Sequence, residues 1–314
     1  MSQIKRRKLQ HTDLINEIYK LPFTSIDDCE DTFINKVLQS EQVGEGGNGN
    51  IYLLDDSIVK VSKKEFLKGE QRTQSEEKCF SGEGCDNDLL LEALIMAQLN
   101  KLNLPTFVRF ESVCFSKTLG YVLTMKHLKN AVPFTNIQRQ LSKQQLLSIL
   151  FQLIFALYQA NSMLHFVHSD LIGMNIMIQM VPDQMLRYPS LNDLTIHNFG
   201  VRPVIIDFGY SRIQVNDSSK LIKLTPSSIP DKFEPEELFD GWIDLCKLLA
   251  NPNFKNKCLE EYKRAIIDNT TLLDLINECN FKTHFYRAVP PFPSINSTNI
   301  HRKLLLSSLF DQIK

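Results

Sequence analysis

The chain has almost no net charge, no closely paired cysteine motif and no long apolar run. Its 35 basic and 36 acidic residues leave a formal net charge of −1. No excess of one sign therefore points to nucleic acid or to a membrane surface as a partner, and we expect neither. The 43% of hydrophobic residues in 314 is enough for a sizeable buried core.

The cysteines number seven, an odd count, and no C-x-x-C pair occurs among them. Scattered spacing of this kind indicates neither a disulfide framework nor a zinc site. We therefore expect reduced cysteines in an intracellular protein. The positions are Cys29, Cys79, Cys85, Cys114, Cys246, Cys258 and Cys279.

No secretory or membrane-spanning segment is predicted. The opening MSQIKRRKLQ is charged, but no apolar segment follows it. The most apolar stretch, residues 146–157, is interrupted by Ser148 and Gln152 and is too short to cross a bilayer. The four basic residues 5–8 fit either a nuclear-import signal or a solvated tail. We expect an intracellular location, cytoplasmic, nuclear or both.

Two short segments carry the chemistry. In HSDLIGMN, residues 168–175, Asp170 precedes Asn175 by five positions. Asp207-Phe208-Gly209 follows the apolar run 203–206, which is short enough to be one buried strand. Phosphoryl transfer from ATP needs a carboxylate that accepts the hydroxyl proton, and an Asn and a second Asp that hold Mg²⁺. The pattern predicts Asp170 as the base and Asn175 and Asp207 as ligands of Mg²⁺ or Mn²⁺.

A glycine-rich segment, GEGGNG, lies upstream and fits G-x-G-x-x-G. A dinucleotide-binding turn would lead into a helix, whereas residues 51–54 and 58–61 here read as strand, turn, strand. Glycines allow the backbone to approach phosphates, and Lys60 in the second strand would reach the α- and β-phosphates. The predicted nucleotide contacts of this segment are Gly44, Glu45, Gly46, Gly47, Asn48, Gly49 and Ile51.

The segment 87–101 has the apolar spacing of a helix. Asp88 and Glu92 are its only acidic residues, and Glu92 shares a face with Met96 and Leu99. A charge on a mostly buried face is costly unless it is paired. We therefore predict that Glu92 pairs with Lys60; a solvated Glu92 is the alternative.

Taken together, these motifs resemble those of the eukaryotic-type protein kinases. The similarity rests on GEGGNG, IVKV, Glu92, HSDLIGMN and PVIIDFGYS, and it covers about residues 40–250. The style of NFGVRPVIIDFGYSR and the reduced C-terminal part resemble most closely the divergent serine/threonine kinases of large DNA viruses. The haspin branch is a more distant relation.

The resemblance implies an α+β, bilobal fold with a small β-rich N-lobe and a larger, mainly helical C-lobe. The expected organisation is an N-terminal extension (1–36), the N-lobe (37–125), a hinge (126–128) and the C-lobe (129–314). Lys126, His127 and Leu128 would meet the adenine edge through their backbones. Met125 is expected as the gatekeeper, with Thr124 as the alternative.

The second half begins with a long helix over residues 143–161, capped by Ser142 and apolar on nearly all sides, as is typical of a core helix. His168 resembles a structural, buried histidine, and His165 is expected to pack. Residues 63–87 and 181–202 are polar or Pro-containing and are predicted to be loop inserts.

Past Asp207 the similarity weakens. Glu234-Pro235-Glu236 resembles the element that closes an activation segment, and Asp240 resembles the helix-start Asp that holds the catalytic loop. Only three residues separate Glu236 from Asp240, too few for both roles, and we favour Asp240. Residues 251–314 are expected to hold two or three helices with no assigned chemistry.

Two positions depart from the family pattern. Ser169 stands where many kinases carry the Arg that meets a phosphorylated activation loop, which argues against that switch. Ile172 stands where serine/threonine kinases usually carry a Lys that neutralises the transferred phosphoryl group. Either another cation replaces that Lys, or turnover is slow, or the substrate is not a protein.

We expect a monomeric, ATP- and Mg²⁺-dependent kinase that acts on serine or threonine hydroxyls of a protein substrate. A small-molecule kinase of the aminoglycoside or choline type shares HxDxxxxN but lacks a well-formed glycine-rich loop, and it is the main alternative. A pseudokinase scaffold is the second, although every expected polar group is present.

Overall fold

The computed structural model describes residues 20–23, 25–45, 49–62, 69–81, 83, 85, 88–188, 194–217, 220–224 and 244. Helices and strands are mixed, and the strands dominate the N-terminal region, as the α+β prediction requires. The described residues fall into two compact units. The first unit comprises the described residues up to Leu128, the segment Gln159–Ser169, and the described residues from Ile206 to 224. The second unit comprises Lys129–Tyr158 and Asp170–Ile205.

A five-stranded antiparallel sheet forms the centre of the first unit, in the order β1-β2-β3-β5-β4. The predicted strand, turn and strand around Lys60 are present as β2 and β3, and the expected strand before the hinge is present as β5. The strands are β1 (Glu41–Glu45), β2 (Gly49–Leu54), β3 (Ser57–Ser62), β4 (Phe110–Ser116) and β5 (Gly120–Lys126).

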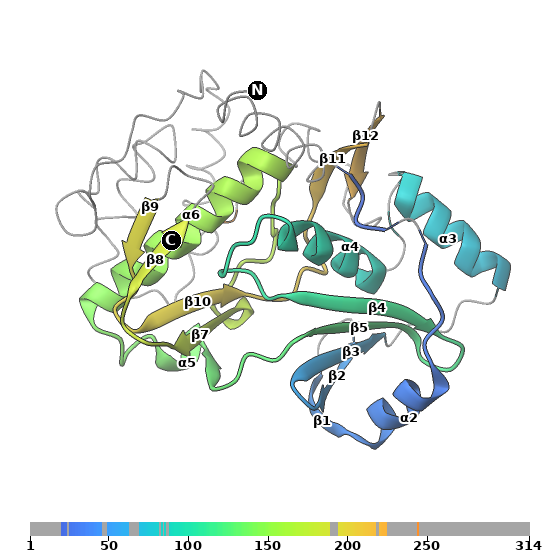
Figure 1. The fold of residues 1–314 in the computed structure, drawn as a ribbon, viewed down its shortest axis with the longest axis horizontal. Coiled ribbons are helices and arrows are strands. Elements are labelled where there is room, and N and C mark those ends of the chain that lie inside the picture. Colours follow the sequence, from blue (N-terminus) through green and yellow to red (C-terminus); the bar gives the residue numbers. More distant parts are fainter. Residues whose placement is uncertain are drawn as a thin grey trace, which may run out of the picture. The chain divides into compact units, whose positions relative to one another are not determined.

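The two faces of this sheet are covered by different helices (Figure 1). Helix α4 (Asp88–Asn100) lies against β4 and β5, and helix α2 (Asp31–Gln39) lies against β2 on the other side. Alternate residues of a strand point to opposite faces. Val59 and Val61 therefore pack with Val37 of α2, and Lys60, between them, points to the face of α4.

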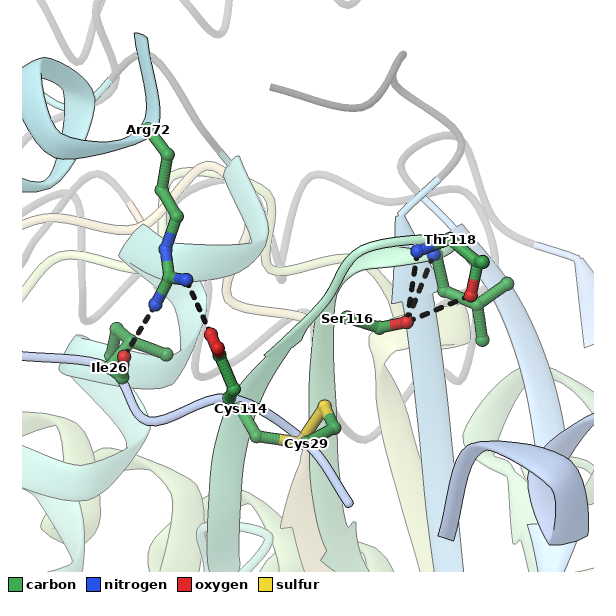
Figure 2. The surroundings of a disulfide bond; sticks show 8 residues. Ile26, Cys29, Arg72, Cys114, Ser116 and Thr118 are labelled. Atoms are coloured by element: carbon green, nitrogen blue, oxygen red, sulfur yellow. Dashed lines mark hydrogen bonds and ion pairs between the residues drawn. A yellow bond between two sulfur atoms is a disulfide. The ribbon is translucent and has the colours of Figure 1, made fainter. Parts of the chain in front are cut away.

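The segment before α2 protects the edge strand β4, which would otherwise expose unpaired backbone groups. Phe115 N donates to Asp27 O at 2.9 Å, and Cys29 N donates to Phe115 O at 2.8 Å. A disulfide then joins Cys29 to Cys114 (Figure 2). The prediction of reduced cysteines is therefore wrong, because sheet pairing brings together two residues 85 positions apart, and spacing along the chain does not reveal this.

The insert 63–87 is not simply a loop: Gly69–Ser81 form helix α3. Arg72 ties it to the rest of the first unit, with its guanidinium 2.6 Å from Ile26 O (Figure 2). The same guanidinium lies 2.6 Å from Asp28 Oδ1 and 4.1 Å from the Phe115 ring centroid. An i,i+4 ion pair with Glu76 adds to these contacts. A second disulfide joins Cys79 to Cys85, again contrary to the prediction.

The second unit contains the three-stranded antiparallel sheet β10-β7-β6. Pro203 lies in β10, an edge strand, where a missing N–H costs no ladder hydrogen bond. The insert 181–202, predicted to be a loop, contains the antiparallel strand pair β8–β9, with Met185 opposite His197 and Tyr188 opposite Leu194. The elements are β6 (Ala131–Pro133), α5 (Phe134–Ile137), β7 (Ile176–Met180), β8 (Met185–Tyr188), β9 (Leu194–His197) and β10 (Val201–Ile205).

Helix α6 (Lys143–Leu164) is the predicted long helix, three residues longer than expected. Gln145 N donates to Ser142 Oγ at 3.2 Å and Ser142 N donates to Gln145 Oε1 at 3.0 Å, so the expected cap is a reciprocal capping box. Residues 144–164 are long and apolar enough to cross a membrane, whereas the stretch 146–157 considered in the sequence was too short. However, 75% of the most apolar part of this helix is buried in the protein, as in a core helix.

Helix α6 is held in the second unit by polar side chains as well as by its apolar residues. Ser148 Oγ donates to His197 O at 2.7 Å, and Gln152 Nε2 donates to Val201 O at 3.2 Å. These are the two residues that interrupt the apolar stretch in the sequence. They connect the helix to the strands that follow Asn175.

The hairpin of β11 (Ile213–Asp217) and β12 (Lys220–Leu224) completes the described part of the first unit. His165, predicted to pack, is exposed and has a φ of 48°, because the chain leaves α6 there in a left-handed turn. The predictions for residues 1–19, for Glu236 and Asp240, and for 251–314 lie outside the described residues.

Candidate functional site: an ion cluster and the Asp170–Asn175 turn

Lys60 is the centre of a buried ion cluster in the first unit. Its Nζ lies 2.7 Å from Glu92 Oε2 and 3.0 Å from Asp207 Oδ1. The predicted pairing of Lys60 with Glu92 is therefore present. The ion pair of Lys60 with Asp207 was not predicted, because 147 residues separate the two partners along the chain.

Glu92 is buried because α4 is packed on all its faces and not only on one. From Leu89 to Met96, every residue of α4 has at most 1% of its surface exposed. An unpaired carboxylate in this position would be strongly destabilising. Lys60 satisfies one oxygen, and the Phe208 N–H donates to the other at 3.3 Å.

The cluster combines two carboxylates with one ammonium, so it carries a net negative charge when all three groups are ionised. Burial alone would lower the pKa of Lys60, but the charges of Glu92 and Asp207 outweigh it and hold that pKa above its ordinary value. Burial raises the pKa of Glu92, and Asp207 adds to this shift while Lys60 opposes it. Lys60 is therefore a permanent cation.

Asp207 is the accessible member of the cluster, with 43% of its side chain exposed. It has a φ of 63°, in the left-handed region that Asp tolerates better than most residues. This turn sends the Asp207 carboxylate to Lys60 and the next side chain, Phe208, into the core. A half-exposed carboxylate that belongs to a net negative cluster is suited to binding a cation.

An aromatic cluster supports the backbone around Asp207. Phe208 is fully buried, with its ring centroid 5.4 Å from that of His168 and 6.2 Å from those of Phe107 and Phe166. His168 Nε2 lies 3.0 Å from Ile206 O, so the buried, structural role predicted for His168 is present. The sequence analysis did not predict the aromatic cluster.

Asp170 and Asn175 form a compact turn in the second unit. Asn175 Nδ2 donates to Asp170 Oδ2 at 3.0 Å and to Asp170 O at 2.9 Å. Ile172 N donates to Asp170 O, and Asn175 N donates to Ile172 O, both at 2.9 Å. The amide of Asn175 thus fixes the Asp170 carboxylate and turns its own Oδ1 away from it.

Ser169 stands where many of the kinases that the sequence resembles carry an Arg. It contacts a cation from elsewhere in the first unit. Arg212 Nη2 and Nε donate to Ser169 Oγ at 2.8 and 3.1 Å. Arg212 is almost fully buried, and its backbone pairs with that of Val167. Arg212 was not predicted from the sequence; its only signal is its position, as a basic residue soon after Asp207-Phe208-Gly209.

Two glycines of the predicted nucleotide loop have different structural roles. Gly44 has room for a Cβ, which would come no closer than 3.6 Å to the nearest atom, on Ile51. A Cβ on Gly49 would lie 2.6 Å from Val61 O, so β2 can approach β3 beside Lys60 only with glycine there. Glu45 ends β1, while Gly46, Gly47 and Asn48 lie outside the described residues.

The strand register places Met125, and not Thr124, on the face of the sheet that carries Lys60. Lys60 lies opposite Leu123, so Met125, two positions on, shares the face of Lys60 and Thr124 does not. In the predicted hinge, Lys126 N donates to Arg109 O and His127 N donates to Asp56 O. Among the described residues, no backbone acceptor pairs with the Leu128 N–H.

The donor atoms fit Mg²⁺ only if phosphate oxygens complete the coordination. Within the described residues, no three His, Cys, Asp or Glu side chains are grouped as metal ligands. Magnesium is usually held by one or two protein oxygens together with substrate phosphates and water. Asp207, in the first unit, offers a carboxylate, and Asn175, in the second unit, offers an amide oxygen.

Comparison with known proteins adds no relative. No protein-family model matches the chain, and no curated protein matches it.

Proposed function

We propose that the chain is an ATP-dependent protein kinase of bilobal, protein-kinase-like fold that transfers the γ-phosphoryl group to serine or threonine hydroxyls. The ion cluster carries this proposal. The sequence motifs predict a phosphate-binding Lys with its Glu partner and, from a different segment, a metal-binding Asp. Lys60 lies within 3.0 Å of a carboxylate oxygen of both others.

Each residue then has a role in the proposed reaction. Lys60, held as a cation, neutralises nucleotide phosphate, and Glu92 positions it. Asp207 and Asn175 would hold Mg²⁺, which supplies charge neutralisation on the phosphates when bound. Asp170 orients the acceptor hydroxyl and accepts its proton as the phosphoryl group leaves ATP.

Within each unit the proposed groups are held by their own neighbours: Lys60 donates to the exposed carboxylate of Asp207, and Asn175 donates to the carboxylate of Asp170. We further propose an intracellular, monomeric enzyme, with its N-lobe in the first unit and its hinge at residues 126–128.

Transfer of radiolabelled phosphate from ATP tests the proposal. Casein and histone are offered in parallel with a panel of aminoalcohols and sugars, with and without Mg²⁺. Label in protein that is lost in Asp170→Asn supports the proposal. Label only in an aminoalcohol or sugar would make the chain a small-molecule kinase, and MgATP binding without any transfer would make it a scaffold.

A further inference from the structure

The turn that carries Asp170 exposes two large apolar side chains. Ile172 is 37% exposed and Met174 is 51% exposed, while Leu171 before them and Gly173 between them are buried. Apolar side chains of this size are usually buried. Here two of them lie on the outer side of the short turn that fixes the proposed base.

Met174 is held in place and does not merely trail in solvent. Thr135 Oγ1, on α5, donates to Met174 Sδ at 2.9 Å. α5 also packs closely on the turn, since a Cβ on Gly173 would lie 2.8 Å from Thr135 Cγ2. A fixed, exposed apolar surface of this kind is a preformed contact for a ligand.

The position of this surface identifies its ligand. A base must lie within hydrogen-bond reach of the hydroxyl it deprotonates, about 3 Å. The exposed side chains of Ile172 and Met174 belong to the same turn, two and four residues beyond Asp170. No charged side chain lies between Asp170 and Asn175 to attract a charged neighbour.

We propose that Ile172 and Met174 form the substrate-recognition surface and select a serine or threonine in a peptide segment with large apolar side chains beside the acceptor. This inference rests on the proposed kinase function and names its substrate class. Ile172 stands where serine/threonine kinases usually carry a Lys. In this chain the side chain would select the peptide substrate and would not neutralise the transferred phosphoryl group.

The test uses three peptides of equal length with one central serine, flanked by leucine and phenylalanine, by arginine, or by aspartate. We expect kcat/KM to be at least about tenfold higher for the apolar peptide, the range that one or two apolar contacts provide. Met174→Glu should remove this preference and favour the arginine peptide, mainly through the peptide KM, with the KM for MgATP unchanged. Ile172→Ala should weaken it in the same direction.

Met180→Glu is the matched control, because Met180 is 57% exposed in the same unit but lies on β7, outside the turn. Its peptide preference should equal that of the unchanged protein. A wild-type preference for arginine or aspartate, or equal rates for all three peptides, would overturn the inference while leaving the kinase proposal intact. Absence of transfer to peptides, casein and histone alike would overturn the kinase proposal itself.

Discussion

The buried ion cluster and the Asp170–Asn175 turn solve different physical problems with similar residues. Lys60, Glu92 and Asp207 come from distant parts of the chain, and two of them are almost fully removed from water. Asp170 and Asn175 are five residues apart, and both are partly exposed. The cluster depends on the packing of the first unit, whereas the turn organises itself through four short-range hydrogen bonds.

This difference predicts where function and stability are coupled. Removing a charge from the cluster leaves its partner buried and unpaired, so folding and chemistry should fail together. Removing the carboxylate of the turn should damage chemistry alone, because water can reach the groups that remain. Each prediction below separates these two cases.

Lys60→Met should have the largest effect. It abolishes phosphoryl transfer and lowers the free energy of unfolding by about 3–5 kcal/mol, because the Glu92 carboxylate remains buried without its cation. Glu92→Gln should reduce activity less, since the amide can still accept a hydrogen bond from Lys60. The variant that carries both Lys60→Met and Glu92→Gln should lose less free energy of unfolding than the sum of the losses of the two single variants, as measured by urea unfolding.

The pH dependence of Lys60→Met sharpens this test. The folded-state pKa of Glu92 is raised, so folding favours its protonated form, and this contribution is present at low pH and lost as pH rises through the raised pKa. Without Lys60 the shift should be larger still. The stability deficit of Lys60→Met relative to wild type should therefore shrink on acidification; a deficit independent of pH would argue against an unpaired buried carboxylate.

Asp170→Asn should reduce kcat by about 10²–10⁴-fold, because it removes the group that accepts the hydroxyl proton. The thermal midpoint and the affinity for MgATP should be unchanged, since the side chain keeps its shape and an oxygen that accepts from Asn175. Steady-state kinetics and thermal shift on the same sample measure both. Near wild-type transfer would show that Asp170 is not the base.

Asp207→Ala should weaken binding of MgATP far more than binding of ATP without metal, because a carboxylate ligand of the cation is lost. Isothermal titration with and without Mg²⁺ measures the difference. The exposure of Asp207 predicts a smaller stability loss than for Lys60→Met. Equal weakening in both titrations would point to general misfolding instead of a lost metal ligand.

The motif residues and the main strands could be predicted because their signals are local. The Lys60–Glu92 pair followed from one buried acid on an apolar helix, and the cap of α6 from Ser142. The disulfide Cys29–Cys114 and the ion pair of Lys60 with Asp207 depend on tertiary packing between distant segments. Helix α3 was missed because its sequence is polar and has no apolar stripe; its contacts to distant residues, such as the ion pair of Arg72 with Asp28, are not visible in a local pattern.

Two glycines should give the smallest effects and a direct comparison of the two regions. Gly49→Ala places its Cβ 2.6 Å from Val61 O, a backbone atom of the sheet, whereas Gly173→Ala places it 2.8 Å from the Thr135 methyl group, which can rotate away. We expect about 1–3 kcal/mol of lost stability for Gly49→Ala and about 1 kcal/mol or less for Gly173→Ala.

Gly44→Ala is the control for both substitutions, because its Cβ meets nothing closer than 3.6 Å. Its unfolding free energy should match wild type, so any rise in its KM for MgATP would reflect close approach of the nucleotide. If Gly173→Ala proved as destabilising as Gly49→Ala, the Asp170–Asn175 turn would be as rigidly packed as the sheet beside the ion cluster. The contrast between a packed cluster and a self-organised turn would then fail.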